Sequence, residues 1–464
     1  MIGGSIMMER QTADQRALFY EFDLDERVPA DHLLRRIDVF TTAALSDLHK
    51  ELVDFYSHTG RPSIDPEFLI RMLIIGYCYG IRSERRLCEE VALNLAYRWF
   101  CRLDLDDDVP DHSTFSKNRH GRFRESDLLR HVFERVVGLC IAEGLVKGET
   151  FAVDASFIQA AASRYHKEAP ETIDWSKIEK PTRAVREYLD ALDEAGGLAP
   201  GRKQPKMISP TDPASAWTSK AHKRAQFGYG LNYLIDTEHA VIVDVEATPA
   251  RTYDEVAATK IMIERTEASF GLKPDRLAAD TAYGTGKFLG WLVDEQKIDP
   301  HIPVWDRSQR EDGTFSRGDF AYDAEKDLYT CPNGKLLRTT GTLQTDNTFR
   351  YVSLKADCDA CPLKSKCCPN QPQRRVGRDP NEAARDYARL LAGTPEFEQS
   401  ANERKKVEMR FGHLKPHHRF DQLRLRGLSG ASDEFHLAAI AQNLKKMALR
   451  VMRLPVHAAA CAAM

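Results

Sequence analysis

Three carboxylates occupy positions where together they could hold divalent cations. Asp154 lies in "FAVDAS", an apolar run typical of a buried strand, and Asp280 ends a second such run, "RLAADTAYG". Glu408 lies in a basic segment, "ERKKVEMRFGHLKPHHRF". A charged carboxylate beside a buried strand is costly unless it has a partner or a metal. Two strand-end acids and a third from a packing helix would form an oxygen cage suited to Mg²⁺.

Such a cage would support phosphoryl-transfer chemistry. Two metal ions roughly 3.5–4 Å apart can activate an attacking water or 3′-hydroxyl and stabilise the leaving oxygen. The alternative is structural, with Asp154 and Asp280 as turn or cap residues and Glu408 paired to Arg404 one helical turn earlier. The spacing of the three acids along the chain does not decide between these interpretations.

The basic segment that contains Glu408 differs from the rest of the chain. It holds eight Lys or Arg and three acids between Glu403 and Arg426, whereas the whole chain has a net charge of −3. A nucleic acid would therefore have to bind at local patches. We expect Val407 and Phe411 to dock this helix on a sheet. Helical spacing places residues 404, 408, 411 and 415 within one face.

The elements that must position the acids follow an α/β pattern. Strands are predicted at residues 149–158, 227–236, 239–249, 275–284 and 299–305, with helices at 253–271 and 286–296 between the later strands. This order predicts a mixed sheet with a hairpin at one side and crossover connections after it. Residues 165–216 hold a charged helix and a Gly/Pro-rich loop, which we interpret as an excursion from that core.

The N-terminal part predicts a helical domain. "PEFLIRMLIIGYCYG" is apolar on all sides, as in a buried helix, and Ser83 is a good cap for the next one. A basic helix is predicted from about Ser113. Short helices with tight turns, ending in a basic one, are compatible with a helix-turn-helix DNA reader, to which Arg119 and Arg122 would contribute.

Several of these segments, in this order, resemble the DDE transposases of bacterial insertion sequences. Arg404, Glu408 and Lys415 match the motif Y-x2-R-x3-E-x6-K, although Ala401 stands in place of the tyrosine. The strand and helix order is similar to their RNase H-like core. "VPDHSTFSKNR" and "SERRLCEEVALNLAYRWFCRLDL" resemble a helical N-terminal domain of the family, and "LAADTAYG" resembles a middle segment. The resemblance covers roughly residues 30–455.

The resemblance implies a function and a site. Asp154, Asp280 and Glu408 would be the catalytic triad, binding Mg²⁺ or Mn²⁺. Positively charged side chains of the same helix would hold DNA phosphates: Arg404, Lys405, Arg410 and Lys415. The enzyme would cleave DNA at terminal inverted repeats and transfer the strand to target DNA, as a homodimer or higher assembly on double-stranded DNA. A metal-dependent nuclease without joining activity and an inactive DNA-binding relic remain as alternatives.

Cysteines are concentrated in residues 307–400. A C-x2-C pair and two further cysteines have spacing close to that of a structural zinc site, formed by Cys331, Cys358, Cys361 and Cys367. Four thiolates would pin a loop-rich insertion with little core of its own. The alternative is a set of reduced thiols. Cysteines 78, 88, 101, 140 and 461 lie in apolar or helical surroundings and are expected to be packing residues.

These observations predict four divisions and exclude other classes of protein. The divisions are residues 1–145, 146–306, 307–400 and 401–464. No apolar run is long enough to span a membrane, and the N-terminus has no secretion-signal pattern, so we expect a cytoplasmic, nucleoid-associated protein. His413 and His417 lack the glutamate of a zinc-protease motif, and Pro416 disfavours helix at Lys415.

Overall fold

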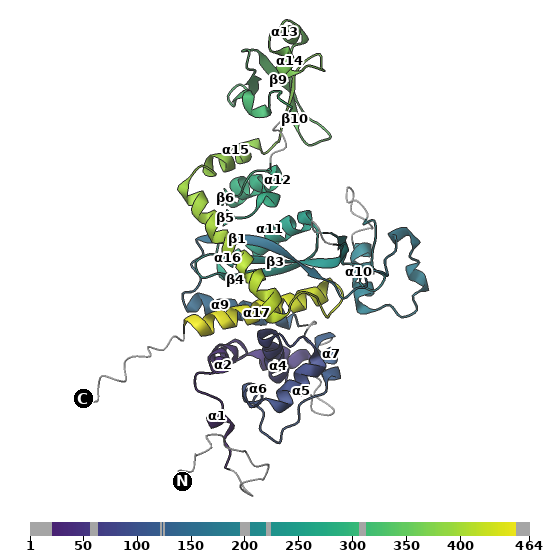
Figure 1. Cartoon of the computed structure of the whole chain (residues 1–464), viewed down its shortest axis with the longest axis vertical. Coiled ribbons are helices and arrows are strands. Elements are labelled where there is room, and N and C mark those ends of the chain that lie inside the picture. The colour runs from purple at the N-terminus through teal and green to yellow at the C-terminus, as the bar shows by residue number, and fades with distance from the viewer. Residues whose placement is uncertain are drawn as a thin grey trace, which may run out of the picture.

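The protein consists of a central sheet with helices at one end and a separate lobe at the other (Figure 1). The computed structural model describes residues 21–55, 64–120, 123, 126–194, 205–219, 224–305 and 312–451. Among the helices in these ranges, none is long and apolar enough to cross a membrane.

The central sheet has the predicted mixed topology. Its strands are β1 (Thr150–Gln159), β3 (Gln226–Asp236), β4 (Val241–Pro249), β5 (Arg276–Ala278) and β6 (Asp299–His301). They lie in the order β4-β3-β1-β5-β6. The β1–β3 and β3–β4 pairs are antiparallel, whereas β5 is parallel to β1 and to β6. This is the RNase H-like arrangement, which confirms the predicted fold class.

The last two strands are shorter than predicted. β5 and β6 have three residues each, and the chain leaves the sheet at Asp280. There the Asp280 carboxylate accepts a hydrogen bond of 2.8 Å from the Ala282 backbone N–H and begins a short helical turn. The apolar run therefore ends in a cap instead of continuing as a strand.

The predicted excursion packs back on the core. It contains α10 (Arg183–Glu194) and ends in β2 (Ala216–Thr218), which pairs with β3. The Gly427 N–H donates to the buried Asp212 carboxylate at 3.1 Å. This segment therefore contacts the chain just before the last helix.

Helices fix the sheet in place. α11 (Thr252–Phe270) packs on β3 and β4, and α12 (Gly286–Gly290) connects β5 to β6. α16 (Pro395–His418) lies on β1, where Phe411 stacks on Tyr233 with ring centroids 4.9 Å apart and Val407 is fully buried. The prediction that these two residues dock the helix is confirmed.

The helix α16 continues past the point predicted from Pro416. It runs through this proline to His418. A proline disfavours helix at the preceding residue, but only one further turn is affected here. The buried His418 ring lies 2.6 Å from the Tyr77 carbonyl oxygen, which holds that last turn against the N-terminal helices.

The N-terminal helices share a core with the sheet domain. They include α2 (Leu33–Ala44), α4 (Pro66–Tyr79), α5 (Glu84–Leu93), α6 (Leu95–Phe100) and α7 (His112–His120). The Ser83 hydroxyl accepts from the Arg86 N–H, as predicted for a cap. The C-terminal helix α17 (Leu428–Arg450) packs against α2, α4 and α9 (Leu128–Ala142) as well as β4, so it joins the two parts.

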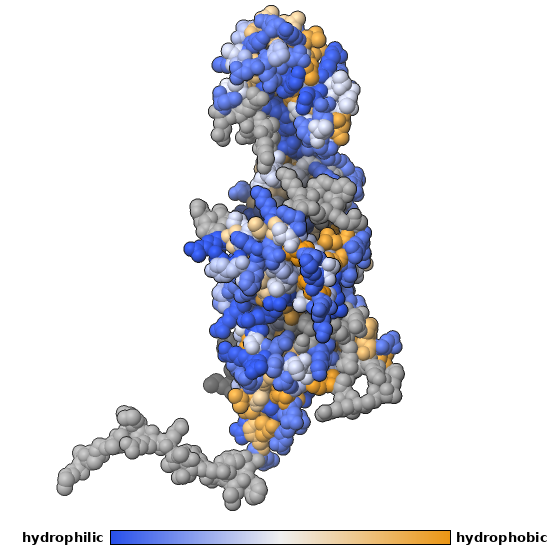
Figure 2. All heavy atoms as spheres, turned by 90° about the vertical axis from the view of Figure 1, so that its right-hand side faces the viewer, coloured by the Kyte–Doolittle hydropathy of each residue, from blue (hydrophilic) through white to orange (hydrophobic). Residues whose placement is uncertain are grey.

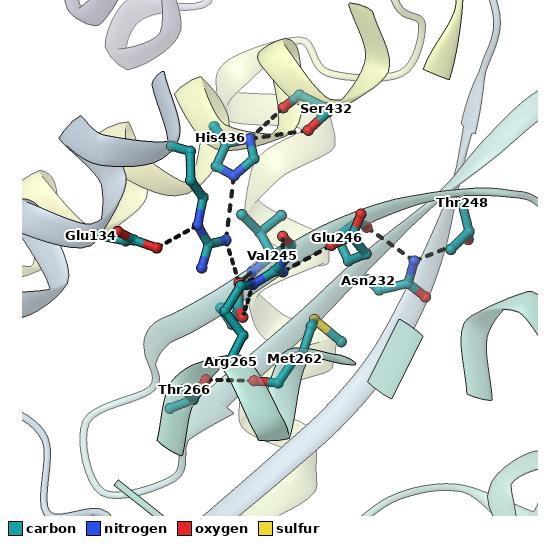
Figure 3. Close-up of polar contacts among 12 residues, drawn as sticks. Glu134, Asn232, Val245, Glu246, Thr248, Met262, Arg265, Thr266, Ser432 and His436 are labelled. Atoms are coloured by element: carbon teal, nitrogen blue, oxygen red, sulfur yellow. Dashed lines mark hydrogen bonds and ion pairs between the residues drawn. The ribbon is translucent and has the colours of Figure 1, made fainter. Parts of the chain in front are cut away.

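A buried charge network reinforces this junction (Figure 3). Asp244 of β4 is fully buried and forms ion pairs with Arg130 of α9 at 2.6 Å and with Arg265 of α11 at 2.8 Å. The His436 ring of α17 lies 3.5 Å from Arg130. Burial, with Arg130 next in effect, lowers the pKa of His436 to about 4, so its imidazole is neutral. Three elements therefore meet at the Asp244 carboxylate, and α17 joins them through the contact of His436 with Arg130.

The insertion is more regular than predicted. It contains an antiparallel sheet of β7 (Ala321–Asp323), β8 (Leu328–Thr330), β9 (Leu336–Leu343), β10 (Phe349–Ser353) and β11 (Arg375–Arg378). A small core of its own includes Phe320, Tyr329, Leu337 and Tyr351. The prediction of a loop-rich segment with little core was therefore wrong. Its short strands are half-exposed and give weak sequence patterns. Figure 2 shows the insertion as a separate lobe.

A buried glutamate fixes the base of this lobe. Glu382, at the start of α15 (Glu382–Leu391), is only 1% exposed and pairs with Arg317 at 2.6 Å, Arg385 at 2.9 Å and Arg389 at 2.8 Å. The charge of Arg317 is one of several that hold the pKa of Glu382 low despite its burial. Because Arg317 belongs to the lobe, this cluster links the lobe to α15.

Candidate active site

The three predicted acids lie where β1, β5 and α16 meet. Asp154 is in the middle of β1, Asp280 is two residues beyond β5, and Glu408 is on α16. Arg404 connects two of them, with Nη2 2.9 Å from the Glu408 carboxylate and Nη1 4.0 Å from the Asp154 carboxylate. The charges of Asp280 and Glu408 both act on Asp154. Tertiary structure thus brings together residues more than 120 positions apart in the sequence.

The electrostatics of Asp154 reveal excess negative charge. Burial is the main cause that raises the pKa of Asp154 to about 6, and Asp280 and Glu408 raise it further. The Ala155 N–H, which donates to Asp154 at 2.8 Å, and the Arg404 guanidinium oppose this shift. Arg404 therefore pairs with two of the three carboxylates, Asp154 and Glu408. A cation at this position would relieve the remaining repulsion.

The structural roles considered as alternatives are also present. Asp280 caps a turn, and Glu408 pairs with Arg404 at i−4. Within the described ranges, no three His, Cys, Asp or Glu side chains are already grouped as ligands of one ion. The donor set still fits a hard cation, because it consists of carboxylate oxygens with too little positive charge around them. The side chain of Glu408 is 49% exposed, so this side of the site is open to solvent.

The predicted DNA-binding residues of α16 fall into two groups. Arg404 faces the acids, Lys405 is exposed and bonded to Asn402 at 2.8 Å, and Lys415 is half-buried. Arg410 points away from them, because its Nε donates to the Ala240 carbonyl oxygen at 2.7 Å. Burial lowers the pKa of Arg410 to about 10. Arg410 therefore joins α16 to the β3–β4 turn, and we do not retain it as a contact to DNA at the active site.

The two arginines predicted in the N-terminal domain are not placed in detail. Arg119 lies in α7, but its side chain is outside the described part of the structure, as is the whole of Arg122. The exposed side chain of Lys117 lies on the same helix.

Sequence reasoning missed Tyr283. It lies three residues after Asp280 in "DTAYG" and is 2% exposed. Burial raises the pKa of its phenol, followed by the negative charges of Glu255, Asp154 and Asp280. Tyr283 thus packs behind the acids, with Glu255 of α11 nearby. Its adjacency to Asp280 was the only signal in the sequence.

The cysteines of the insertion also converge. A cavity of about 20 Å³ is lined by the four predicted cysteines and by Cys368 as well. All five are free thiols. Burial, followed by the neighbouring Cys368, raises the pKa of Cys367 to about 11, and the Cys358 sulfur lies 3.0 Å from the Ser353 hydroxyl. Cys78, Cys101 and Cys140 are buried in the main core, as expected for packing residues; Cys461 lies outside the described residues.

Comparison with known families identifies both ends of the chain. Residues 22–121 match a family model described as a transposase domain (DUF772), and residues 330–448, which include Glu408, match a transposase DDE domain. The chain thus matches transposase models in two separate regions, and these matches support a DDE transposase. It is thus a DNA transposase, with a helical N-terminal domain and a mixed-sheet core.

More distant comparisons add little to this assignment. The transposase matches no curated protein at a significant level. A cryo-EM structure of the piggyBac transposase synaptic complex with hairpin DNA aligns with 90% of this chain and 74% of that chain at 9% identity. Its TM-score of 0.36 is too low to show that the two folds coincide.

Proposed function

We propose that this transposase performs metal-dependent DNA strand cleavage and strand transfer with Asp154, Asp280 and Glu408 as its catalytic acids. The supporting observation is their convergence from two strands and a helix, around Arg404 and with a raised pKa at Asp154. Mg²⁺ or Mn²⁺ bound there would supply charge stabilisation at phosphorus and a more acidic attacking hydroxyl.

The acids and the basic residues of the site would have different roles. Asp154 projects from β1 and Asp280 from the turn after β5, and both carboxylates accept backbone N–H groups, so they would form the rigid side of the site. Glu408 comes from α16 and completes the ligand set. Arg404 would then be released from Glu408 to hold a DNA phosphate, with Lys405 and Lys415 along the same helix. Because strand transfer joins two ends to one target, we also propose an assembly of at least two copies on double-stranded DNA.

A cleavage and strand-transfer assay tests this proposal. Labelled duplexes carrying the flanks of the gene are incubated with the full chain and Mg²⁺. Nicked and joined products support a transposase with both steps. Nicked products without joined ones indicate a nuclease instead. DNA binding without any cleaved product, with Mg²⁺ and with Mn²⁺, would indicate an inactive DNA-binding protein.

Metal affinity should depend on pH. The pKa of Asp154 is raised to about 6, so this carboxyl is protonated below that pH and cannot bind metal. We expect the apparent affinity for Mn²⁺ to fall about tenfold for each pH unit below about 6 and to level off above it. Calorimetric titration from pH 5 to 8 measures this. An affinity independent of pH over that range would contradict the role of Asp154 as a ligand.

We also propose that the cysteine cavity of the lobe binds a structural Zn²⁺. Zn²⁺ binds the thiolate form of cysteine, so binding should release thiol protons and tighten with rising pH. Protein expressed with zinc should contain one ion per chain, and a Cys358→Ser/Cys361→Ser variant should lose it and unfold at lower temperature. Cys88→Ser, on α5, is the matched control and should keep its zinc. Wild-type protein without bound zinc would rule out the site.

A further inference from the structure

A group of cations surrounds the β3–β4 turn, Thr237–Ala240. The Lys406 ammonium donates to the Thr237 carbonyl oxygen, and the Arg410 guanidinium donates to that of Ala240. Arg450 lies 2.9 Å from the ring of His239. Lys446, one turn before Arg450 on α17, lies near all three of these Lys and Arg residues. We call Lys406, Arg410, Lys446 and Arg450 the turn cluster.

The turn cluster has no direct ion pair in the part of the chain that the structure describes. In the described ranges, none of its four members forms an ion pair with a carboxylate; the acids nearby are committed elsewhere. Asp236 accepts from the backbone N–H groups of Lys147, Gly148 and Glu238, at 2.8–2.9 Å. Glu238 is paired with Lys147 at 3.5 Å. Glu403 accepts from the Thr237 hydroxyl at 3.1 Å and from Gln399 at 2.9 Å.

The repulsion within the turn cluster affects the pKa of Lys446. Burial lowers the pKa of Lys446 to about 8, and Arg410, Arg450 and Lys406 lower it further, with no carboxylate acting in the opposite direction. Like charges one turn apart on a helix are destabilising. The fold therefore maintains an unfavourable arrangement that an anion would stabilise.

The turn cluster is separate from the catalytic acids. Lys406 and Arg410 lie on the side of α16 opposite to Arg404 and Glu408, given 3.6 residues per turn. The turn adjoins the first residue of β1, because the Thr237 N–H donates to the Thr150 carbonyl oxygen at 3.0 Å. Asp154 is four residues further along β1, roughly 13 Å at the usual rise of a strand. A phosphate bound here cannot be the one that reacts.

We infer that the turn cluster binds the phosphate backbone of a DNA segment other than the one in the active site. This rests on the proposed function, since it takes DNA as the substrate. Arg450 is exposed, whereas Lys406, Arg410 and Lys446 are partly exposed. Arg410 is held by the Ala240 carbonyl oxygen and contributes charge, and the other three present their head groups to phosphate oxygens. Contact through Lys and Arg to phosphates positions a duplex without reading its sequence.

The salt dependence of DNA binding tests this inference. Binding of the full chain to a labelled element-end duplex and to a scrambled duplex is measured by fluorescence anisotropy without divalent metal, over a range of salt concentrations. The Lys446→Ala/Arg450→Ala variant should bind both duplexes more weakly, and its log–log salt slope should fall by about 1 to 2, because each lost phosphate contact removes about 0.9. Its thermal stability should not fall, since like-charge repulsion is relieved.

A matched control uses one lysine and one arginine on the insertion lobe. Lys326 is 71% exposed and paired with Asp323, and Arg350 is 41% exposed and paired with Asp346. The Lys326→Ala/Arg350→Ala variant should keep the wild-type slope.

An unchanged salt slope in the turn-cluster variant, or an equal fall of the slope in the control variant, would overturn the inference. The inference would also be overturned if sedimentation without DNA showed that wild type and the control form a dimer and the turn-cluster variant does not. The turn cluster would then bind a second copy of the chain and not DNA. If wild type cleaves DNA and the salt slope of the turn-cluster variant is unchanged, only the turn-cluster inference is rejected. If the slope of the variant falls but wild type does not cleave DNA, only the proposed chemistry is rejected.

Discussion

Replacing Asp154 with Asn should abolish cleavage while leaving a folded, DNA-binding protein. We expect the rate of strand cleavage to fall about 10³-fold or more, the scale of losing a group that acts directly on charge in the transition state. The amide keeps the size of the side chain but cannot supply an anionic oxygen to a cation. A gel assay of labelled duplex cleavage with Mg²⁺ and with Mn²⁺ measures this.

The same variant should be more stable than wild type in metal-free buffer. Because the pKa of Asp154 is raised to about 6, the folded protein binds more protons than the unfolded chain between about pH 4 and 6. Stability from this residue therefore falls as pH rises through that window and stays low above it. Removing the charge should raise the free energy of unfolding at pH 8 by about 1–3 kcal/mol.

The two measurements together separate function from folding. Lost cleavage with unchanged DNA affinity and a higher melting temperature identifies Asp154 as a functional acid held at a cost in stability. Asp346→Asn, at an exposed site on the lobe, serves as a control and should change neither property. Wild-type cleavage by Asp154→Asn would remove Asp154 from the catalytic set.

Removing the buried Asp244 should give the largest loss of stability. Its carboxylate pairs with Arg130 and Arg265 and also accepts the Val245 N–H at 2.6 Å. Asp244→Ala leaves Arg130, only 8% exposed, without its closest carboxylate. Breaking a buried ion pair from one side costs about 3–5 kcal/mol. Denaturant unfolding followed by circular dichroism should show this decrease.

The loss of stability should extend beyond the sheet, because Arg130 belongs to α9 and contacts His436 of α17. We expect protease cleavage at the junction with the N-terminal helices to accelerate in Asp244→Ala. Asp346→Ala removes an exposed pair and should leave the unfolding midpoint unchanged. A loss for Asp244→Ala no larger than about 1 kcal/mol, the scale of a surface pair, would show that the network does not stabilise the junction.

The sequence alone determined most elements of the core, and its resemblance to a known family singled out the three acids. The period of apolar residues is a local property, so the strands around Asp154, the helix of Val407 and Phe411 and the cap at Ser83 could be predicted from neighbouring residues. Resemblance to the motif Y-x2-R-x3-E-x6-K singled out Arg404, Glu408 and Lys415 on α16.

Only the tertiary structure decided which charges act together. Arg410 and Arg404 carry the same charge in the same basic segment. Arg410 nevertheless binds the Ala240 carbonyl oxygen of the β3–β4 turn, whereas Arg404 bridges two acids. The turn cluster joins residues of two helices, and the Asp244 network joins three helices and a strand. Electrostatic interactions depend on distance and burial in space, and neither can be read from spacing along the chain.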